Sequence, residues 1–169
     1  MHCTRQNLVD QLARVRQNGL YDLMATAAGE YGVSVAFVLA VASRETNMTH
    51  EIGDGGHGVG ILQLDTQHAL AANLEASGAW DTESGKRQLI GACVQMLAAN
   101  QAWAESACPK IVSKYGKDAA RKLAAAAYNA GRGNALAGIR DASDSDLYTT
   151  GHDYGADVVE RMHVLEELL

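Results

Sequence analysis

The 169 residues are the length of one domain, and a chain of this size buries roughly two-thirds of its unfolded surface without needing a disulfide or a metal. Its formal net charge of −6 lacks the basic excess on which nucleic-acid binding and adhesion to anionic membranes depend. Twenty-nine alanines and a single proline favour a mostly α-helical fold, because alanine has the highest helix propensity and proline the lowest.

Apolar residues recur at helical spacing through the first part of the chain and predict helices over 8–19, 20–31 and 35–47. Gly32 is expected to end the second helix, and Ser34 to be the N-cap of the third. The stretch 48–60 holds five glycines and no helical period, which predicts a loop or a short hairpin. The longest apolar run has ten residues, too few to span a bilayer.

Further helices are predicted over 65–77, 82–107, 118–130 and 153–168. Asp65 or Thr66 is expected to cap the first of these, and the polar segment 141–151 is expected to be a loop. No internal repeat or linker divides the chain. We therefore expect a single, mostly α domain over 1–169, with a small β-hairpin near 53–64.

The cysteines are Cys3, Cys93 and Cys108. An odd count, without a visible secretory signal, predicts reduced thiols and synthesis in the cytoplasm. Cys93 and Cys108 are expected to be buried as small apolar residues.

Glu45 is the most informative single residue. It follows Phe37, Val38 and Val41 at helical spacing, so its carboxylate belongs to an apolar helix face. A carboxylate in such surroundings is either paired with a base such as Arg44 or has a raised pKa, the property required of a general acid near neutral pH.

Two more carboxylates, Asp54 and Asp65, lie within 20 residues of Glu45 and flank a glycine-rich turn. Paired carboxylates carry out glycoside hydrolysis: one protonates the leaving oxygen, and the other activates water or stabilises the cationic sugar. The alternative interpretation is a helix N-cap and an ordinary loop aspartate.

Neither metal nor cofactor is indicated. The spacing of His50, Glu51, Asp54 and His57 fits neither the two-histidine helical zinc motif nor a calcium loop. The glycines of 53–60 are not followed by the Gly-Lys-Ser/Thr of a phosphate loop.

Four segments together resemble goose-type lysozyme and, more loosely, lytic transglycosylases: 43–47 (SRETN), 54–65 (DGGHGVGILQLD), 127–131 (AYNAG) and 152–154 (HDY). The resemblance implies a lysozyme-like domain whose cleft lies between the helix of Glu45 and the hairpin. It implies cleavage of the β-1,4 bond between N-acetylmuramic acid and N-acetylglucosamine in peptidoglycan. Glu45 would be the general acid, and Asp54 and Asp65 would hold or activate water, with inversion at the anomeric carbon.

The same resemblance assigns the cleft wall. Tyr128 would lie near the acid, Asn129 near a sugar, and Gln63 beside the bound glycan, while Tyr154 would support Glu45 and His57 would touch substrate. Each tyrosine could instead be a packing residue, and Gln63 could make an ordinary strand-end hydrogen bond.

Three functions remain open from the sequence. The chain could be a hydrolase, a lytic transglycosylase that forms 1,6-anhydro ends without water, or a non-catalytic peptidoglycan-binding component. The carboxylates Asp54 and Asp65 favour hydrolysis, because lytic transglycosylases generally lack them. We expect a monomer that acts on glycan strands, with neither nucleic acid nor membrane insertion, as a phage lysin released to the wall through a partner pore. An injected antibacterial effector and a cytosolic animal enzyme are the other sources that the sequence allows.

Overall fold

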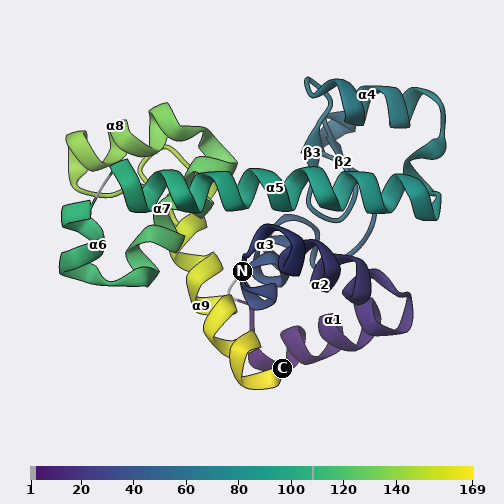
Figure 1. Cartoon of the computed structure of the whole chain (residues 1–169), viewed down its shortest axis with the longest axis horizontal. Helices are drawn as coiled ribbons and strands as arrows, with labels where there is room; N and C mark the ends of the chain where they lie inside the picture. Colours follow the sequence, from purple (N-terminus) through teal and green to yellow (C-terminus); the bar gives the residue numbers. More distant parts are fainter. Residues whose placement is uncertain (1–2, 108) are drawn as a thin grey trace.

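The computed structural model describes residues 3–107 and 109–169, apart from the side chains of Asp54, Ile111, Lys114 and Tyr115. It is mostly helical, as predicted (Figure 1). The helices are α1 (Arg5–Gln17), α2 (Leu20–Tyr31), α3 (Val35–Thr46), α4 (Ala69–Ala76), α5 (Glu83–Ala107), α6 (Pro109–Tyr115), α7 (Lys117–Ala130), α8 (Arg132–Ala142) and α9 (Tyr154–Leu168). Short 3-10 turns are η1 (Asp54–Gly56), η2 (Ala79–Asp81) and η3 (Thr150–His152).

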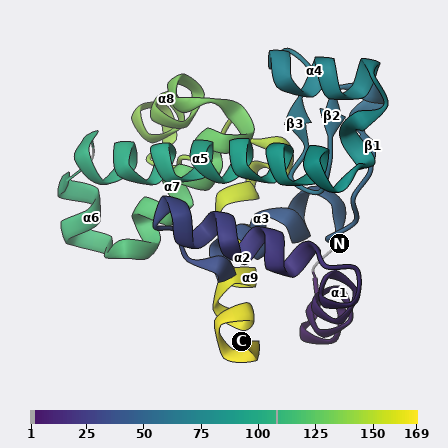
Figure 2. The same ribbon diagram turned by 45° about the vertical axis from the view of Figure 1, so that its right-hand side comes forward.

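The glycine-rich stretch forms a small antiparallel sheet of three strands, one more than a hairpin. The strands are β1 (Ile52–Gly53), β2 (Gly58–Val59) and β3 (Leu64–Asp65), in the order β1-β2-β3. Val59 pairs with Ile52 on one side and with Leu64 on the other. Figure 2 shows the sheet beside α4, near one end of the long helix α5.

Helix α3 lies at the centre of the molecule, and its residues from Ala36 to Ser43 are buried on every side. A helix that is apolar around its whole circumference is stable only when neighbours cover it. Here α9 and α2 pack against it, and α5 crosses above them (Figure 1). The last turn of α3, which carries Glu45, therefore has a rigid support.

Four consecutive alanines, 124–127, give α7 a smooth buried face. Small side chains allow helix axes to approach closely, and α7 packs against both α5 and α9. This packing brings the C-terminal end of α7 and the start of α9 to the same region of the molecule. Both ends carry residues that the sequence predicts to be functional.

Two predictions about elements are wrong. Helix α4 begins at Ala69, capped by the His68 ring nitrogen, which accepts the N–H of Leu70. Asp65 instead ends β3, where its carboxylate accepts the N–H of Gln67 in a tight turn. Helix α8 follows directly after Gly131, between the predicted helix 118–130 and the predicted loop 141–151, where no helix was predicted.

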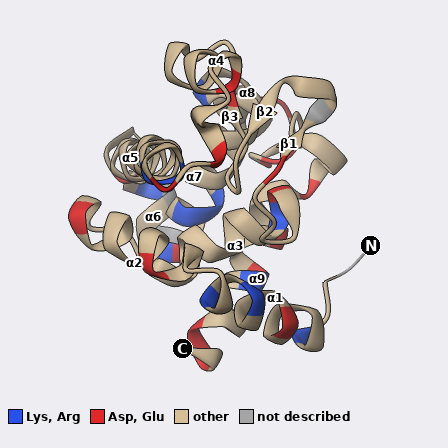
Figure 3. Ribbon diagram, turned by 90° about the vertical axis from the view of Figure 1, so that its right-hand side faces the viewer, with Lys and Arg blue, Asp and Glu red and all other residues tan. Residues whose placement is uncertain are grey.

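The structure tests the expected burial of Cys93 and the expected lack of a membrane-spanning helix. Cys93 is buried, as expected, whereas Cys108 lies outside the described residues. In the described part of the chain, no helix is both long and apolar enough to cross a membrane. Figure 3 shows acidic and basic residues interspersed along the helices, without a basic stripe.

Candidate active-site cleft

A hollow of about 490 Å³ lies where the end of α3, the sheet, the end of α7 and the start of α9 meet. Seven residues singled out in the sequence line it together: Glu45, His57, Gln63, Asp65, Tyr128, Asn129 and Tyr154. Arg44, Glu51 and Thr150 also line it, and the sequence did not predict a place for them there. The side chain of Asp54 lies outside the described part, although its backbone forms η1 between β1 and β2.

Glu45 occupies the last turn of α3, half-buried, with its carboxylate in the hollow. The Tyr154 hydroxyl donates a hydrogen bond to Oε1 of Glu45, so α9 supports the carboxylate as expected. The pKa of Tyr154 is well above its usual value, because the ring is buried and the Glu45 charge opposes a second anion. The phenol therefore keeps its proton and acts as a donor.

Two left-handed residues after Glu45 turn the chain from α3 into the sheet. Asn47 has φ 53° and Met48 φ 58°, and their N–H groups return to the carbonyls of Ser43 and Ala42. Neither residue is glycine, so each conformation costs on the order of 1 kcal/mol. The burial of Met48 offsets that cost and fixes the angle between Glu45 and the sheet.

Tyr128 lies in the last turn of α7, and its hydroxyl donates to the carbonyl of Leu62 at 2.7 Å. Burial is the main cause that raises the pKa of Tyr128 well above its usual value, and neighbouring Cys93 and Glu45 add to it. Tyr128 is thus both a cleft residue and a packing residue whose hydroxyl is satisfied. Its bond ties α7 to the turn between β2 and β3.

Asn129 lines the hollow from the last turn of α7. Its Oδ1 accepts the backbone N–H of Thr150 at 2.9 Å, which joins the end of α7 to the loop that precedes α9.

Gln63 shapes the sheet from the inside. Its amide nitrogen donates to the carbonyls of Gly60 at 2.7 Å and Glu51 at 3.2 Å. Its Oε1 occupies the space that a Cβ would take at Gly53 and at Gly58. Packing against Gln63 therefore requires glycine at these two positions. Gln63 makes the strand-end hydrogen bonds that the sequence left open for it, and it also lines the cleft.

Of the seven candidates that line the hollow, Asp65 and His57 are the exposed ones. Asp65 lines the hollow from the end of β3, with one carboxylate oxygen held by the N–H of Gln67 at 2.7 Å. A second carboxylate therefore lines the same hollow as Glu45.

Arg44, considered in the sequence as a partner for Glu45, contacts two other carboxylates. Its guanidinium bridges Asp157 and Asp153, each at 2.8 Å. The two aspartates are four residues apart at the start of α9 and so share one helix face. Like charges at this spacing repel each other, so a cationic partner is expected between them. The identity of that partner depends on tertiary packing, which the sequence pattern does not contain.

The start of α9 is anchored by Asp146, in the segment expected to be only a polar loop. Its carboxylate is buried and accepts the N–H groups of Gly155 at 2.7 Å and Ala156 at 2.9 Å. Negative charge at a helix N-terminus is favourable, and Lys122 supplies a counter-ion at 3.4 Å. This anchor places Tyr154 against Glu45.

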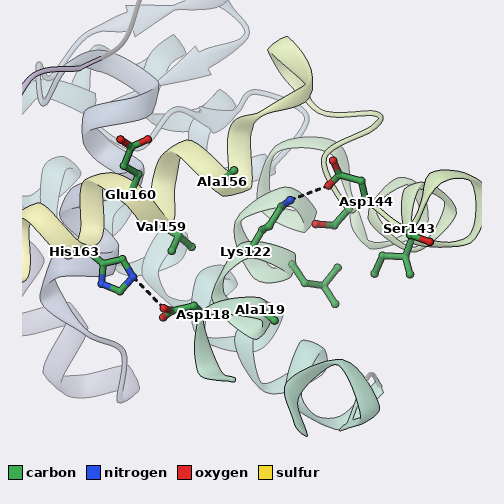
Figure 4. A pocket seen from close by; sticks show the side chains of 12 residues that line it. Asp118, Ala119, Lys122, Ser143, Asp144, Ala156, Val159, Glu160 and His163 are labelled. Carbon is green, nitrogen blue, oxygen red and sulfur yellow. Dashed lines mark hydrogen bonds and ion pairs between the residues drawn. The ribbon is translucent and has the colours of Figure 1, made fainter. Parts of the chain in front are cut away.

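A second, larger hollow of about 870 Å³ lies between α7, α8 and α9 (Figure 4). Four of its ionisable groups form two pairs: Lys122 with Asp144 at 2.8 Å, and His163 with Asp118 at 3.0 Å. None of the seven described candidates lines it. Within the described residues, moreover, no three His, Cys, Asp or Glu side chains come together as a metal site.

Carboxylates from a helix end and from a small sheet, facing one hollow, define a glycoside hydrolase of the lysozyme-like class. A comparison with curated proteins finds no match. The family described as Lysozyme g matches residues 12–167, and the chain therefore belongs to the goose-type lysozymes. It is a cell-wall glycoside hydrolase with peptidoglycan as its substrate.

Proposed function

We propose that the chain hydrolyses the β-1,4 bond between N-acetylmuramic acid and N-acetylglucosamine, with Glu45 as the general acid. The observation that carries the proposal is the half-buried Glu45 carboxylate, held by the Tyr154 hydroxyl in a hollow that Asp65 also lines.

In the proposed reaction, protonated Glu45 gives its proton to the glycosidic oxygen as the C1–O bond breaks. The Tyr154 hydroxyl donates to Oε1 of this carboxyl group throughout the step. The donor then stabilises the carboxylate that forms, since hydrogen bonds to a charged acceptor are the stronger ones. Glu45 ends the step as an anion, and the leaving sugar carries a new hydroxyl.

Water completes the reaction on the opposite face of the sugar. We propose that Asp65, together with Asp54, positions this water and takes its proton as oxygen bonds to C1, which inverts the anomeric configuration. Inverting enzymes need about 6.5–9.5 Å between the two carboxyl groups to admit the water. The position of Asp65 at the end of β3, in the lining of the same hollow as Glu45, supports this role.

Replacing Glu45 with Gln tests the acid directly. Glu45→Gln keeps the shape and the hydrogen-bond acceptor but has no proton to transfer, so release of reducing ends from purified walls should fall by about 10²–10⁴-fold. Glu30→Gln, an exposed carboxamide substitution on α2, is the matched control and should retain full activity. Near-normal lysis by Glu45→Gln would rule out the assignment.

For the cellular setting, we propose a monomer made in the cytoplasm and released to the wall through a partner pore, as in phage-mediated lysis. The free thiols of Cys3 and Cys93 support synthesis in a reducing compartment. A bacterial host that expresses the chain should stay intact until its inner membrane is permeabilised with chloroform, and then lyse. Lysis without permeabilisation would contradict this route.

A further inference from the structure

Arg44 has an unusual set of partners for a residue next to the proposed acid. Besides bridging Asp153 and Asp157, its guanidinium donates to the carbonyl of Thr150 at 3.1 Å. It also lies over the ring of Tyr154, 5.5 Å from the ring centre. Its side chain is only 19% exposed, so these contacts are made largely out of water, where they are stronger.

The groups that Arg44 contacts are those that hold the cleft in place. Tyr154 carries the hydroxyl that donates to Glu45, and the N–H of Thr150 is held by Asn129. One guanidinium therefore joins α3, the loop before α9 and the first turn of α9 around the Glu45 carboxylate.

A different residue already clamps α3 to α9. Arg161, one turn beyond Asp157, donates to that carboxylate at 2.9 Å and to the carbonyl of Ser43 at 3.1 Å. It is 6% exposed, deeper than Arg44. The helix pair is thus secured without Arg44, whose contacts to Asp153, Thr150 and Tyr154 all lie toward the cleft.

We propose that Arg44 is a positioning residue that fixes the Tyr154 hydroxyl on Glu45. The inference rests on the proposed function of Glu45 for its kinetic effect, but the geometry can be tested separately. A guanidinium suits the task because its planar fork bonds two carboxylates while its face stacks on an aromatic ring. The ammonium group of a lysine has neither property.

A double-mutant cycle on soluble peptidoglycan fragments tests whether Arg44 acts through Tyr154. Arg44→Gln should lower kcat by about tenfold or more with a smaller change in KM, because misplacing a catalytic group costs rate rather than affinity. In the Tyr154→Phe background, the same substitution should change kcat by less than about twofold, because the hydroxyl through which Arg44 acts is already absent. Arg44→Lys should recover only part of the loss.

Multiplying effects in the double variant would overturn the proposal and make Arg44 a general stabiliser. Arg140→Gln is the matched control, because Arg140 also donates two hydrogen bonds to carboxylate oxygens, here both of Asp141, at 2.7 and 3.1 Å, but on the exposed surface. It should leave kcat unchanged. If Arg44→Gln does not fold, Asp153→Asn removes a single, half-exposed arm and should shift kcat in the same direction.

A crystal structure of the Arg44→Gln protein gives a readout that does not depend on activity. The Tyr154 hydroxyl should leave Oε1 of Glu45, and an unchanged hydrogen bond would overturn the positioning role. If the unmodified chain released no glycan products at all, the proposed function would fail, while this structural comparison would still decide the role of Arg44.

Discussion

At the scale of single residues, His50 shows how a side chain beside the cleft responds to acid. Its ring is 6% exposed, stacks on Trp80 at 5.0 Å and points Nε2 at the Trp80 carbonyl at 3.2 Å. The proton of the neutral ring is therefore on Nε2. Nδ1 is buried and has no hydrogen-bond partner in the described part of the chain.

Burial lowers the pKa of His50, and the charge of Lys86 acts in the same direction, while the Trp80 carbonyl and Asp81 oppose it. The unfolded chain therefore binds more protons than the folded one once the pH falls below about 6.5. The stability contribution of His50 is complete above that pH and is lost on acidification.

His50→Gln should reduce this acid sensitivity, because an amide can still donate to the Trp80 carbonyl but does not titrate. Urea denaturation at pH 7.5 and pH 5 measures the loss of unfolding free energy, which should be smaller in the variant than in the unmodified chain. His57→Gln, at an exposed ring, serves as control. An equal loss in His50→Gln and the unmodified protein would contradict the account.

Individual residues differ in how far the sequence predicts them. Glu45 is predicted well, because its spacing from Val41 and Val38 places a carboxylate on an apolar helix. Asp146 and Arg44 are not, because their partners come from other helices. Likewise, burial of His50 depends on η2 packing over the chain before β1, which no local pattern announces.

At the scale of elements, the sheet needs glycine at positions 53 and 58 because the Gln63 side chain fills the space that a Cβ would occupy there. A methyl group at Gly58 would collide with the Gln63 side chain, which is itself fixed by two backbone carbonyls. Gly58→Ala should therefore lower the free energy of unfolding by about 1–3 kcal/mol, the usual cost of overpacking. It should also reduce activity, because Gln63 lines the cleft.

Gly29→Ala is the matched control on α2. A Cβ there meets open space, and the residue is inside a helix, so the substitution should stabilise the protein by about 0.5–1 kcal/mol. Thermal or urea unfolding measures both variants. A Gly58→Ala protein as stable as Gly29→Ala would show that the Gln63 packing is unimportant.

Long periodic helices are the elements that the sequence predicts best. The bounds of α2 and α9 follow from apolar spacing and a terminal glycine or turn. Those of α5 follow from apolar residues that recur at helical spacing along its 25 residues. Helix α8 was missed because Gly131 and Gly133 dominate its start. The third strand was missed because a two-residue strand has too few residues to show alternation.

At the scale of the whole molecule, the net charge of −6 bears on how the enzyme meets its substrate. Bacterial envelopes are anionic, so the mean field of this chain repels them, and binding must rely on short-range contacts in the cleft. Salt screens charges beyond a Debye length of about 8 Å at 0.15 M. Raising the ionic strength should weaken the repulsion and leave cleft contacts nearly intact.

The rate of wall lysis should therefore stay level or rise between low and physiological salt. Replacing the exposed carboxylates Glu30, Glu83 and Glu105 with lysine brings the formal net charge to zero and should speed lysis at low salt. Turbidity assays across a salt series measure both. A steep fall in the rate of the unmodified chain with rising salt would contradict this account.

The released products are the most direct test of the proposed hydrolysis by Glu45 with water directed by Asp65. Purified peptidoglycan is digested, the new ends are identified by mass spectrometry, and the anomeric configuration at the first turnover is read by proton NMR. Hydrolysis by this route should give reducing ends with inverted configuration. Products with 1,6-anhydro ends would contradict it and show a lytic transglycosylase, and wall binding without product would show a non-catalytic component.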